Sequence, residues 1–395
     1  MTLDATPPRA WAMLGVGVLA QVAGTVFVSA PAFLIPLLHL QRGISLAEAG
    51  LLAAAPTLGL VLTLIAWGAL ADRIGERWVI AGGLALTALA AVGTVLASGY
   101  VLLGVFFLLG GMAAASANAA SGRVVVGWFP KHRRGLAMGI RQMAQPLGVT
   151  VSAITIPVIA ADGGIAAALT VPLVFTAVLA VVCALVIVNP PRATRAPDSA
   201  APANPYLTSA FLWRIHAVSA LLVLPQFLLA TFGLVWLVSE LRWEPLAAGI
   251  LVGVSQFVGA IGRIGVGILS DRVGSRVRPL RWVAISASAV MLLLAAADAA
   301  QFGAAAIVFV LATSVTVADN GLAFTSVAEM AGTAWAGRAL GTQNTAQFVA
   351  ASIAPPLFGA LIGLVGYPLT FVVAAVAPVV AIPLIPGVAA EHDHL

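Results

Sequence analysis

Long apolar stretches with almost no charged residues constrain this chain more than any other feature. The stretches are about 20 residues or longer and lack a period-2 alternation, so they predict helices rather than strands. Only 8% of the residues are charged, whereas a soluble domain carries about 25%. A chain with so few charges cannot cover a surface in water, and lipid permits only helices or closed barrels to cross it. We therefore predict an all-α integral membrane protein.

Twelve of these stretches are long enough to cross a bilayer. The predicted spans, with ends good to about two to four residues, are 11–38, 46–69, 78–98, 101–128, 136–160, 165–188, 210–238, 247–269, 282–300, 304–328, 338–364 and 368–388. If the N-terminus is cytoplasmic, fourteen Lys and Arg residues fall in cytoplasmic segments, and only Arg42 and Arg242 fall outside. The positive-inside rule therefore predicts cytoplasmic N- and C-termini. The pI near 10.3 reflects this topology and does not indicate nucleic-acid binding.

The chain shows no pattern typical of an enzyme or of a cofactor site. Its one cysteine, Cys183, lies in an apolar stretch, which excludes an intrachain disulfide and a cysteine-based metal site. H-E-x-x-H, G-x-S-x-G and a pair of intramembrane aspartates are absent from the sequence. A membrane receptor or sensor would usually add a soluble signalling domain to its membrane helices. The longest polar segment in this chain is only a short linker. The sequence therefore predicts neither a cofactor nor a metal site.

The sequence repeats itself at an offset of about half its length. GALADRIGERWVI, which begins at Gly68, reappears as GILSDRVGSRVRP, which begins at Gly267. GIRQMAQ and GTQNTAQ align Gln145 with Gln347, and Asn118 aligns with Asn320 at nearly the same offset. We therefore predict two related six-helix halves, 1–188 and 210–395, joined by the Pro/Ala-rich cytoplasmic linker 189–209.

These features resemble the major facilitator superfamily of secondary transporters over essentially the whole chain. The repeated phrase matches the family's G-x-L-A-D-R-x-G-x-R signature between helices 2 and 3 and its echo between helices 8 and 9. The resemblance implies two pseudo-symmetric six-helix bundles that work by alternating access, as a monomer. One lysine against eighteen arginines, with heavy use of alanine, suggests a bacterial protein, here in the inner membrane. It also implies a cytoplasmic conformational latch, comprising Gly68, Asp72, Arg73, Gly75, Arg77, Gly267, Asp271, Arg272, Gly274 and Arg276. The alternative, a basic loop that only orients the chain, would need neither the aspartates nor the glycines.

Two arginines inside the spans are the leading candidates for substrate binding, because buried charge in a membrane is costly and usually functional. Arg263 lies eight residues before Asp271, where it resembles the anion-binding arginine of oxalate/formate antiporters, nitrate/nitrite porters and monocarboxylate transporters. Arg141 lies at a similar depth in helix 5, which in the family faces helix 8. A guanidinium pairs bidentately with carboxylate or nitrate, so the two predict a clamp on one small anion. The structural alternatives are that Arg263 snorkels or braces Asp271, and that Arg141 neutralises a carboxylate such as Glu329.

Uncharged polar residues within the spans complete the predicted binding site. Gln145 shares a helical face with Arg141, and Gln256 shares one with Arg263. The other candidates are Gln21, Asn118, Asn320, Gln343 and Gln347. For the two asparagines the alternative is an interhelical hydrogen bond. Arg123 lies five residues before Trp128 and is assigned a structural role at the membrane surface.

Asp319 is the one acidic residue that this topology buries well, near the predicted midplane of helix 10. Burial favours the neutral form of a carboxyl group and a nearby arginine opposes it, a combination that suits proton coupling. The alternative is a fixed ion pair with an arginine. His216, near the start of helix 7, is predicted to be a solvated histidine at a helix end.

The patterns together predict a secondary transporter of a small, carboxylate-like anion, coupled to protons. The alternative is a proton-driven exporter of amphipathic drugs or metabolites. Against that alternative, the helix-4 arginine typical of many drug exporters would fall near Phe107 and is missing, and the exporter motif of helix 5 is degraded. The signatures of nitrate porters and the helix-1 motif of monocarboxylate transporters are missing as well, so the sequence leaves the anion unidentified.

Overall fold

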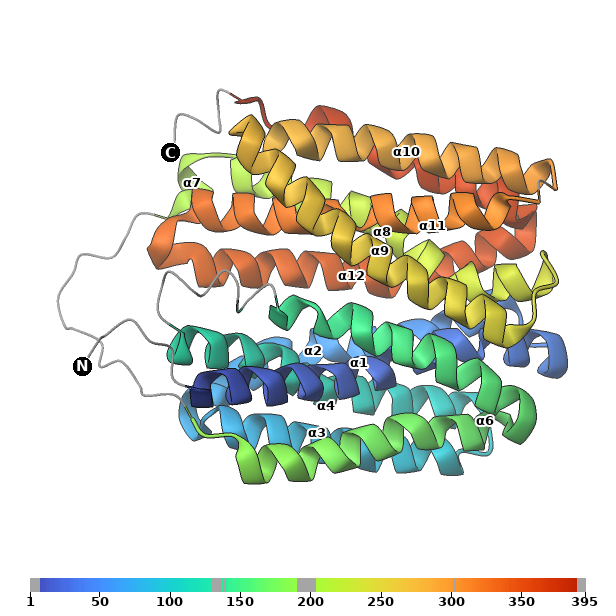
Figure 1. Cartoon of the computed structure of the whole chain (residues 1–395), viewed down its shortest axis with the longest axis horizontal. Helices are drawn as coiled ribbons and strands as arrows, with labels where there is room; N and C mark the ends of the chain where they lie inside the picture. Colours follow the sequence, from blue (N-terminus) through green and yellow to red (C-terminus); the bar gives the residue numbers. More distant parts are fainter. Residues whose placement is uncertain (1–7, 130–136, 138–139, 190–203, 302, 389–395) are drawn as a thin grey trace. The chain divides into compact units, whose positions relative to one another are not determined.

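The structure, a computed structural model, is helical throughout the part of the chain that it describes (Figure 1). The described residues are 8–129, 137, 140–189, 204–301 and 303–388. The elements are α1 (Pro8–Arg42), α2 (Leu46–Ile74), α3 (Glu76–Leu96), α4 (Tyr100–Trp128), α6 (Ala144–Val186), α7 (Pro205–Thr208), α8 (Phe211–Ser239), α9 (Pro245–Val273), α10 (Val277–Ala299), α11 (Ala305–Thr316), α12 (Asp319–Ala381) and the 3₁₀ turn η2 (Ile382–Leu384).

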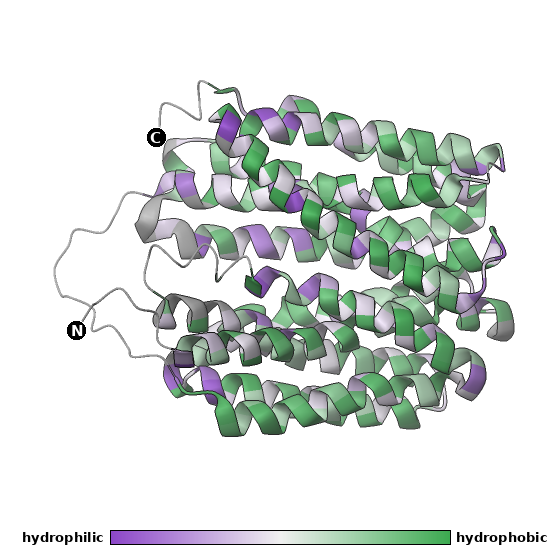
Figure 2. Cartoon of the chain, viewed as in Figure 1, coloured by the Kyte–Doolittle hydropathy of each residue, from purple (hydrophilic) through white to green (hydrophobic). Residues whose placement is uncertain are grey.

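Ten helices in the described ranges are long and apolar enough to cross a membrane. Two of them, Ile140–Val186 and Arg338–Leu384, are 47 residues long, or about 70 Å at 1.5 Å per residue, which is twice the ~30 Å thickness of a bilayer core. Each contains a glycine at positive φ, Gly164 at 78° and Gly366 at 78°. The chain can reverse at these glycines, so each long helix supplies two of the predicted crossings, and the all-α membrane fold is confirmed. Hydrophobic residues run along the helices in Figure 2.

The chain forms two compact units. Unit 1 comprises Met1–Gly43, Leu51–Ala196 and Glu244–Gly253, and unit 2 comprises Ile44–Gly50, Pro197–Trp243 and Val254–Leu395. Most of each unit comes from one half of the sequence, while the first turns of α2 and α9 belong to the opposite unit. The boundary 189–209 stays a prediction, since 190–203 lie outside the described residues.

Unit 1 is built from tight helix contacts. α1 packs on α6 and α4, and α3 packs on α4 and α6. Its core includes the fully buried Cys183 together with Val79, Ile80 and Leu84 of α3. α2 and α4 approach so closely that a Cβ on Gly59 would lie 2.1 Å from the Leu108 carbonyl oxygen. Glycine is required at such a point because any side chain would collide with backbone.

Gly111→Ala should destabilise unit 1, because its added Cβ would lie 2.0 Å from the Pro56 carbonyl oxygen. Overpacking against backbone costs about 1–3 kcal/mol, so the melting temperature in detergent should fall. Gly104→Ala, on the same helix, is the control: its Cβ would meet only Leu52 at 3.6 Å. That variant should melt at or slightly above the parent temperature, since alanine favours helix over glycine. Equal melting of the two variants would contradict the packing argument.

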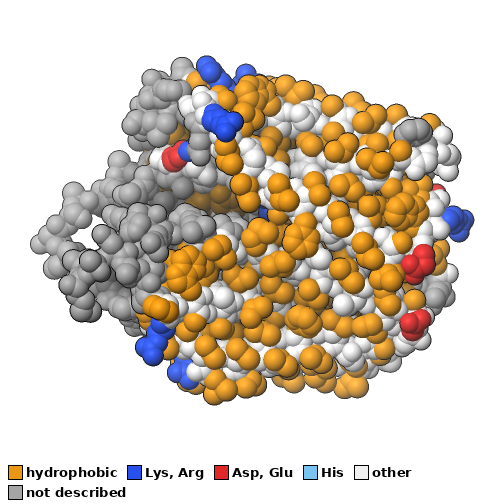
Figure 3. All heavy atoms as spheres, in the orientation of Figure 1, with side chains coloured by type: hydrophobic (Ala, Val, Ile, Leu, Met, Phe, Trp, Pro, Cys, Tyr) orange, Lys and Arg blue, Asp and Glu red, His pale blue; other side chains and the backbone are white. Residues whose placement is uncertain are grey.

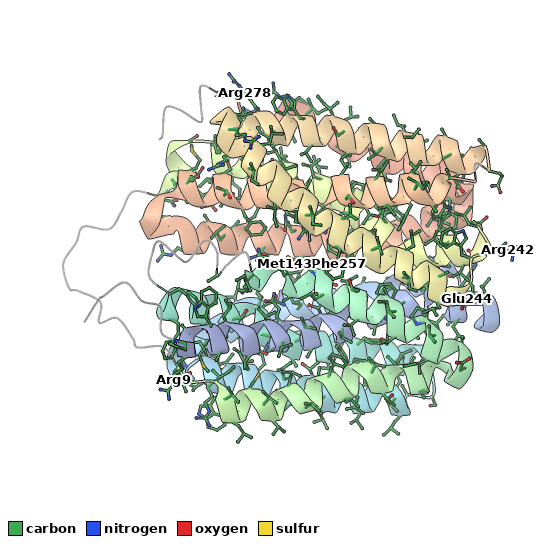
Figure 4. All side chains as sticks on the ribbon, viewed as in Figure 1. Arg9, Met143, Arg242, Glu244, Phe257 and Arg278 are labelled. Atoms are coloured by element: carbon green, nitrogen blue, oxygen red, sulfur yellow. The ribbon has the colours of Figure 1, made fainter. Side chains whose placement is uncertain are left out.

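Unit 2 centres on α12, which packs on α8 and α10, while α10 also packs on α11. Trp236 of α8 is fully buried and donates to Asp298 of α10 through a 2.9 Å hydrogen bond from its indole Nε1. Arg278 at the start of α10 and Arg242 in the loop before α9 lie at opposite ends of this unit (Figure 4). The face drawn in Figure 3 is largely hydrophobic, with its charged side chains close to helix ends.

A local tightening of the helix precedes Asp319. α11 ends at Thr316, Val317 and Ala318 form a turn, and α12 begins at Asp319. Both turn residues keep right-handed helical dihedrals, and Ala305–Ala331 is one apolar segment long enough to cross a membrane. The amide of Ala318 donates to the Val315 carbonyl at 3.1 Å, three residues back rather than four, so the predicted helix 10 continues through a tightened turn.

Candidate functional site

A polar cluster in unit 1 joins α1, α4 and the residues just before α6. Gln21 donates to the side-chain oxygen of Asn118 at 2.8 Å. Arg141 donates from Nε to the Ser121 hydroxyl at 2.9 Å and from Nη2 to the Asn118 carbonyl at 3.0 Å. Met143, labelled in Figure 4, is the N-cap of α6 and places Arg141 one turn before that helix. Two of the hydrogen bonds of the Arg141 guanidinium thus go to a hydroxyl and a backbone carbonyl of α4.

A second polar cluster lies in unit 2 between α8 and α12. Gln347 donates to the Ser219 hydroxyl at 2.6 Å and to the Asn320 side-chain oxygen at 2.8 Å. Asn320 in turn donates to Gln226 at 3.1 Å. The asparagines related by the repeat, Asn118 and Asn320, are therefore both bonded to glutamines of neighbouring helices. These contacts agree with the interhelical alternative and place both asparagines beside the predicted substrate residues.

Arg263 and Asp319 both lie at the turn between α11 and α12. The Arg263 Nε donates to the Val317 carbonyl at 3.0 Å, an oxygen in the turn. The Asp319 carboxylate is 0% exposed and interacts electrostatically with Arg263. It lies close to the backbone amides of Asp319 and Asn320 at the first turn of α12, yet neither oxygen completes a hydrogen bond in the described part of the chain. A buried carboxyl group without hydrogen bonds is costly in either protonation state, so Asp319 stays a candidate for a functional role.

The expectation of a solvated His216 is wrong. His216 is 4% exposed, and its Nε2 lies 2.9 Å from the Tyr206 hydroxyl. Its Nδ1 lies 2.5 Å from the Gln343 side-chain oxygen. The short helix α7 brings Tyr206 over the histidine, and the two rings stack with centroids 5.8 Å apart. Gln343, predicted to bind substrate, is fully buried and engaged in this contact.

The other predicted binding residues lie outside the two clusters. Gln145, on the first turn of α6, is exposed, and Gln256 of α9 is half-buried next to Phe257, which Figure 4 labels. Neither has a role assigned by geometry, and their part in binding stays a prediction. The side chain of Arg123 lies outside the described part of the structure.

The repeated latch phrase forms a turn in each unit. Gly75 and Gly274 adopt φ of 89° and 64°, where only glycine is unstrained. Arg276 pairs bidentately with Glu329 at 3.2 and 3.0 Å and also donates to Ser270 at 3.0 Å. Glu329 therefore has an arginine partner on the latch of its own unit.

The first latch is held differently from the second. The backbone amide of Arg77 donates to the Asn189 side chain at 2.9 Å, and its Nε donates to the Ala184 carbonyl at 2.8 Å. Gly68, Arg73, Gly267 and Arg272 lie at the adjoining helix ends. The side chains of Asp72 and Asp271, the carboxylates of the phrase, lie outside the described residues. The latch function stays a prediction.

The sequence analysis missed four site residues: Ser121, Ser219, Gln226 and Tyr206. Ser121 lies three residues after Asn118 and Ser219 three after His216, and both are buried, so helical spacing from the known candidates could have found them. Tyr206 lies in the predicted linker, where no apolar period indicated a docked helix.

Comparison with known proteins shows which family this chain belongs to. Residues 17–355 match the Major Facilitator Superfamily. An MFS-type transporter of Mycobacterium tuberculosis (strain ATCC 25618 / H37Rv) is 47% identical over 377 residues, covering 95% of this chain and 84% of the relative. A probable chloroplastic anion transporter of Arabidopsis thaliana is 33% identical over 131 residues, 32% of this chain and 24% of that protein.

The fold has solved counterparts. A bacterial homolog to the human lysosomal transporter Spinster, solved in an inward-facing and occupied conformation, has a TM-score of 0.83 at 15% identity, covering 99% of this chain and 98% of that chain. A structure of a bacterial Spinster homolog in an inward-facing and unoccupied conformation has a TM-score of 0.80. These findings agree with one another. The family match covers residues 17–355, and the Mycobacterium tuberculosis relative is 47% identical. This chain therefore belongs to the Major Facilitator Superfamily, and it is a multi-pass membrane transporter rather than an enzyme.

Proposed function

We propose that this transporter moves a small, carboxylate-like anion across the membrane together with protons. The observation that carries the proposal is that Arg263 binds the Val317 carbonyl at the turn between α11 and α12, two residues before the buried Asp319, with which it interacts electrostatically. Arg263 supplies a charge that can pair with an anion, and Asp319 supplies a buried carboxyl group that can take up a proton.

Anion binding and proton binding are linked if the substrate anion and the Asp319 carboxylate both interact with the Arg263 guanidinium. When Asp319 is ionised, it competes with the substrate for the positive charge of Arg263. A bound anion weakens the attraction that keeps Asp319 ionised, and so promotes proton uptake. By thermodynamic reciprocity, protonation of Asp319 strengthens anion binding by the same factor. Coupled movement of anion and proton then needs no further ion.

Arg141 supports the anionic substrate from unit 1. Two of its hydrogen bonds go to a hydroxyl and a backbone carbonyl of α4, and they hold in place a guanidinium of the kind that pairs bidentately with carboxylates. We propose that Arg141 and Arg263 both bind the substrate, with Asn118, Asn320 and Gln347 fixing the position of polar groups nearby. The partial match to a probable anion transporter points in the same direction.

We further propose a location in a bacterial inner membrane, as a monomer with both termini in the cytoplasm. The bias of arginines toward one side of the predicted topology supports this orientation.

The test is binding and uptake by the purified protein. Thermal shift in detergent would compare formate, oxalate, lactate, nitrate and cyanate with lipophilic cations such as tetraphenylphosphonium. Hits would then be followed as radiolabelled uptake into proteoliposomes with an imposed pH gradient. We expect stabilisation by at least one small anion, stronger at lower pH, and loss of that stabilisation in Arg141→Gln. Stabilisation by the cations alone would overturn the proposal in favour of an amphipathic-compound exporter.

A further inference from the structure

A cavity of about 550 Å³ lies within unit 1, between α2, α3 and α4. Its walls are almost entirely apolar and include Leu70 of α2, Leu86 and Leu89 of α3, and Leu109 of α4. Leu86 and Leu89 are 51% and 66% exposed, so the cavity opens at the surface of the helices. It shares no residue with the two polar clusters. It is large enough for a ligand, and its surroundings are hydrocarbon.

The polar groups that line the cavity are hydrogen-bonded within the protein. The glycine contacts between α2 and α4 bring these two helices together at Gly59 and Gly111. Beyond that point, Thr63 and Trp67 donate to the same carbonyl of Met112, at 2.6 and 2.7 Å. These bonds occupy the polar hydrogens on the cavity wall, and what remains is carbon. The cavity therefore suits an alkyl chain.

An exposed face of α3 runs from the cavity toward the loop between α2 and α3. Trp78, Gly82 and Leu86 follow one another on this face at four-residue intervals, and a Cβ on Gly82 would meet no atom within 4 Å. No side chain at position 82 therefore stands between the exposed Trp78 and the cavity-lining Leu86 on this face.

Positive charge lies at the end of this path. On α2, the exposed Arg73 lies one turn beyond Leu70. Across the loop, the Arg77 guanidinium lies 5.0 Å from the centre of the Trp78 ring. A tryptophan and arginines near the ends of membrane helices are the arrangement expected at the level of lipid headgroups.

The cavity and the exposed face of α3 beside it are together called the groove. We propose that this groove binds an anionic phospholipid of the surrounding membrane. One acyl chain fills the cavity between α2, α3 and α4 and passes over Gly82, and the phosphate lies at Arg73 and Arg77 beside Trp78. The acyl chain gains from burial as any alkyl group does, and the two arginines favour an anionic headgroup over a zwitterionic one.

Native mass spectrometry of the purified protein, given equal amounts of phosphatidylglycerol and phosphatidylcholine with identical acyl chains, tests the proposal. We expect about tenfold or greater preference for phosphatidylglycerol in the first bound lipid, falling with salt. Arg73→Gln combined with Arg77→Gln should bring the two lipids to equal occupancy. Equal binding of both lipids by the parent protein would overturn the headgroup assignment.

Two variants should block the groove, one by adding a side chain on α3 and the other by enlarging a side chain on α2. Gly82→Leu blocks the path on α3, and Ala66→Phe fills the cavity from α2; both should lose the bound lipid. Gly15→Leu is the matched control, since Gly15 is an exposed glycine with open space on α1, at a similar distance from the start of its helix. That control should retain the lipid. Retention by Gly82→Leu and Ala66→Phe at the level of the control, with all three melting like the parent, would rule the site out.

Discussion

Asp319→Asn should abolish proton-driven accumulation of the substrate while leaving exchange of substrate across the membrane intact. The asparagine resembles a protonated aspartate in shape and has no charge, so it cannot take up or release a proton. In proteoliposomes with a pH gradient of about one unit, a carrier that moves one proton per anion accumulates about tenfold, because a factor of ten corresponds to about 1.4 kcal/mol per proton. The variant should reach a ratio near one. Counterflow of labelled substrate against unlabelled substrate should continue.

The pH dependence of anion binding tests the role of Asp319 without a transport assay. In the parent protein, anion affinity should fall as the pH rises, because ionised Asp319 competes for Arg263. In Asp319→Asn the affinity should stay constant over the same range. Asp298→Asn is the control, since Asp298 is also a buried carboxylate of unit 2, and the asparagine oxygen can still accept from Trp236. Uphill uptake by Asp319→Asn at the parent level would remove Asp319 from the coupling mechanism.

Arg263→Lys should lose about 10- to 100-fold in transport despite the retained charge, the range expected for one lost hydrogen bond to a charged group. Arginine donates to the Val317 carbonyl through Nε and keeps both Nη groups for an anion. Lysine has one ammonium, which cannot hold the carbonyl and present a planar fork to a carboxylate at the same time. The measurement is initial uptake rate against substrate concentration in proteoliposomes.

Arg214→Lys provides the comparison for this substitution. Arg214 also donates to backbone carbonyls, those of Leu384 and Pro383 at 2.8 and 3.1 Å, but it lies away from the polar cluster of unit 2. Its lysine variant should transport at the parent rate. The double variant Arg141→Gln, Arg263→Lys then measures coupling between the arginines: if one anion contacts both, the two losses will not add. Parent-like transport by both single variants would contradict an anion site at these arginines.

Much of the fold could be predicted because the bilayer imposes simple rules. Apolar length and the position of the arginines both act through the cost of polar groups in lipid, and they predicted the helical spans and their orientation. The half-length repeat predicted the two related halves. The turn glycines of the repeated phrase could be predicted for a similar reason, since a tight reversal needs positive φ at Gly75 and Gly274. These features depend on local sequence and solvent.

The parts of the site that depend on packing could not be predicted. The turn at Val317–Ala318 contains neither proline nor glycine, so nothing in the local sequence indicated that the helix tightens before Asp319. His216 was expected in water because its position in the sequence does not reveal that α7 folds back over it. Gln145 and Gln347 occupy equivalent places in the repeat, yet one is exposed and the other bonds to Ser219 and Asn320. Equivalent sequence positions acquired different neighbours as the halves diverged.

The burial of Cys183 gives an experimental advantage. It is the one cysteine in the sequence, and its side chain is fully enclosed in the core of unit 1. A thiol in apolar surroundings reacts slowly with maleimides, because the thiolate is the reactive form and burial disfavours it. The natural protein is therefore close to a cysteine-free background. Single cysteines placed on exposed helix ends should accept fluorophores or spin labels selectively, so distance changes during the transport cycle can be followed without first replacing a core residue.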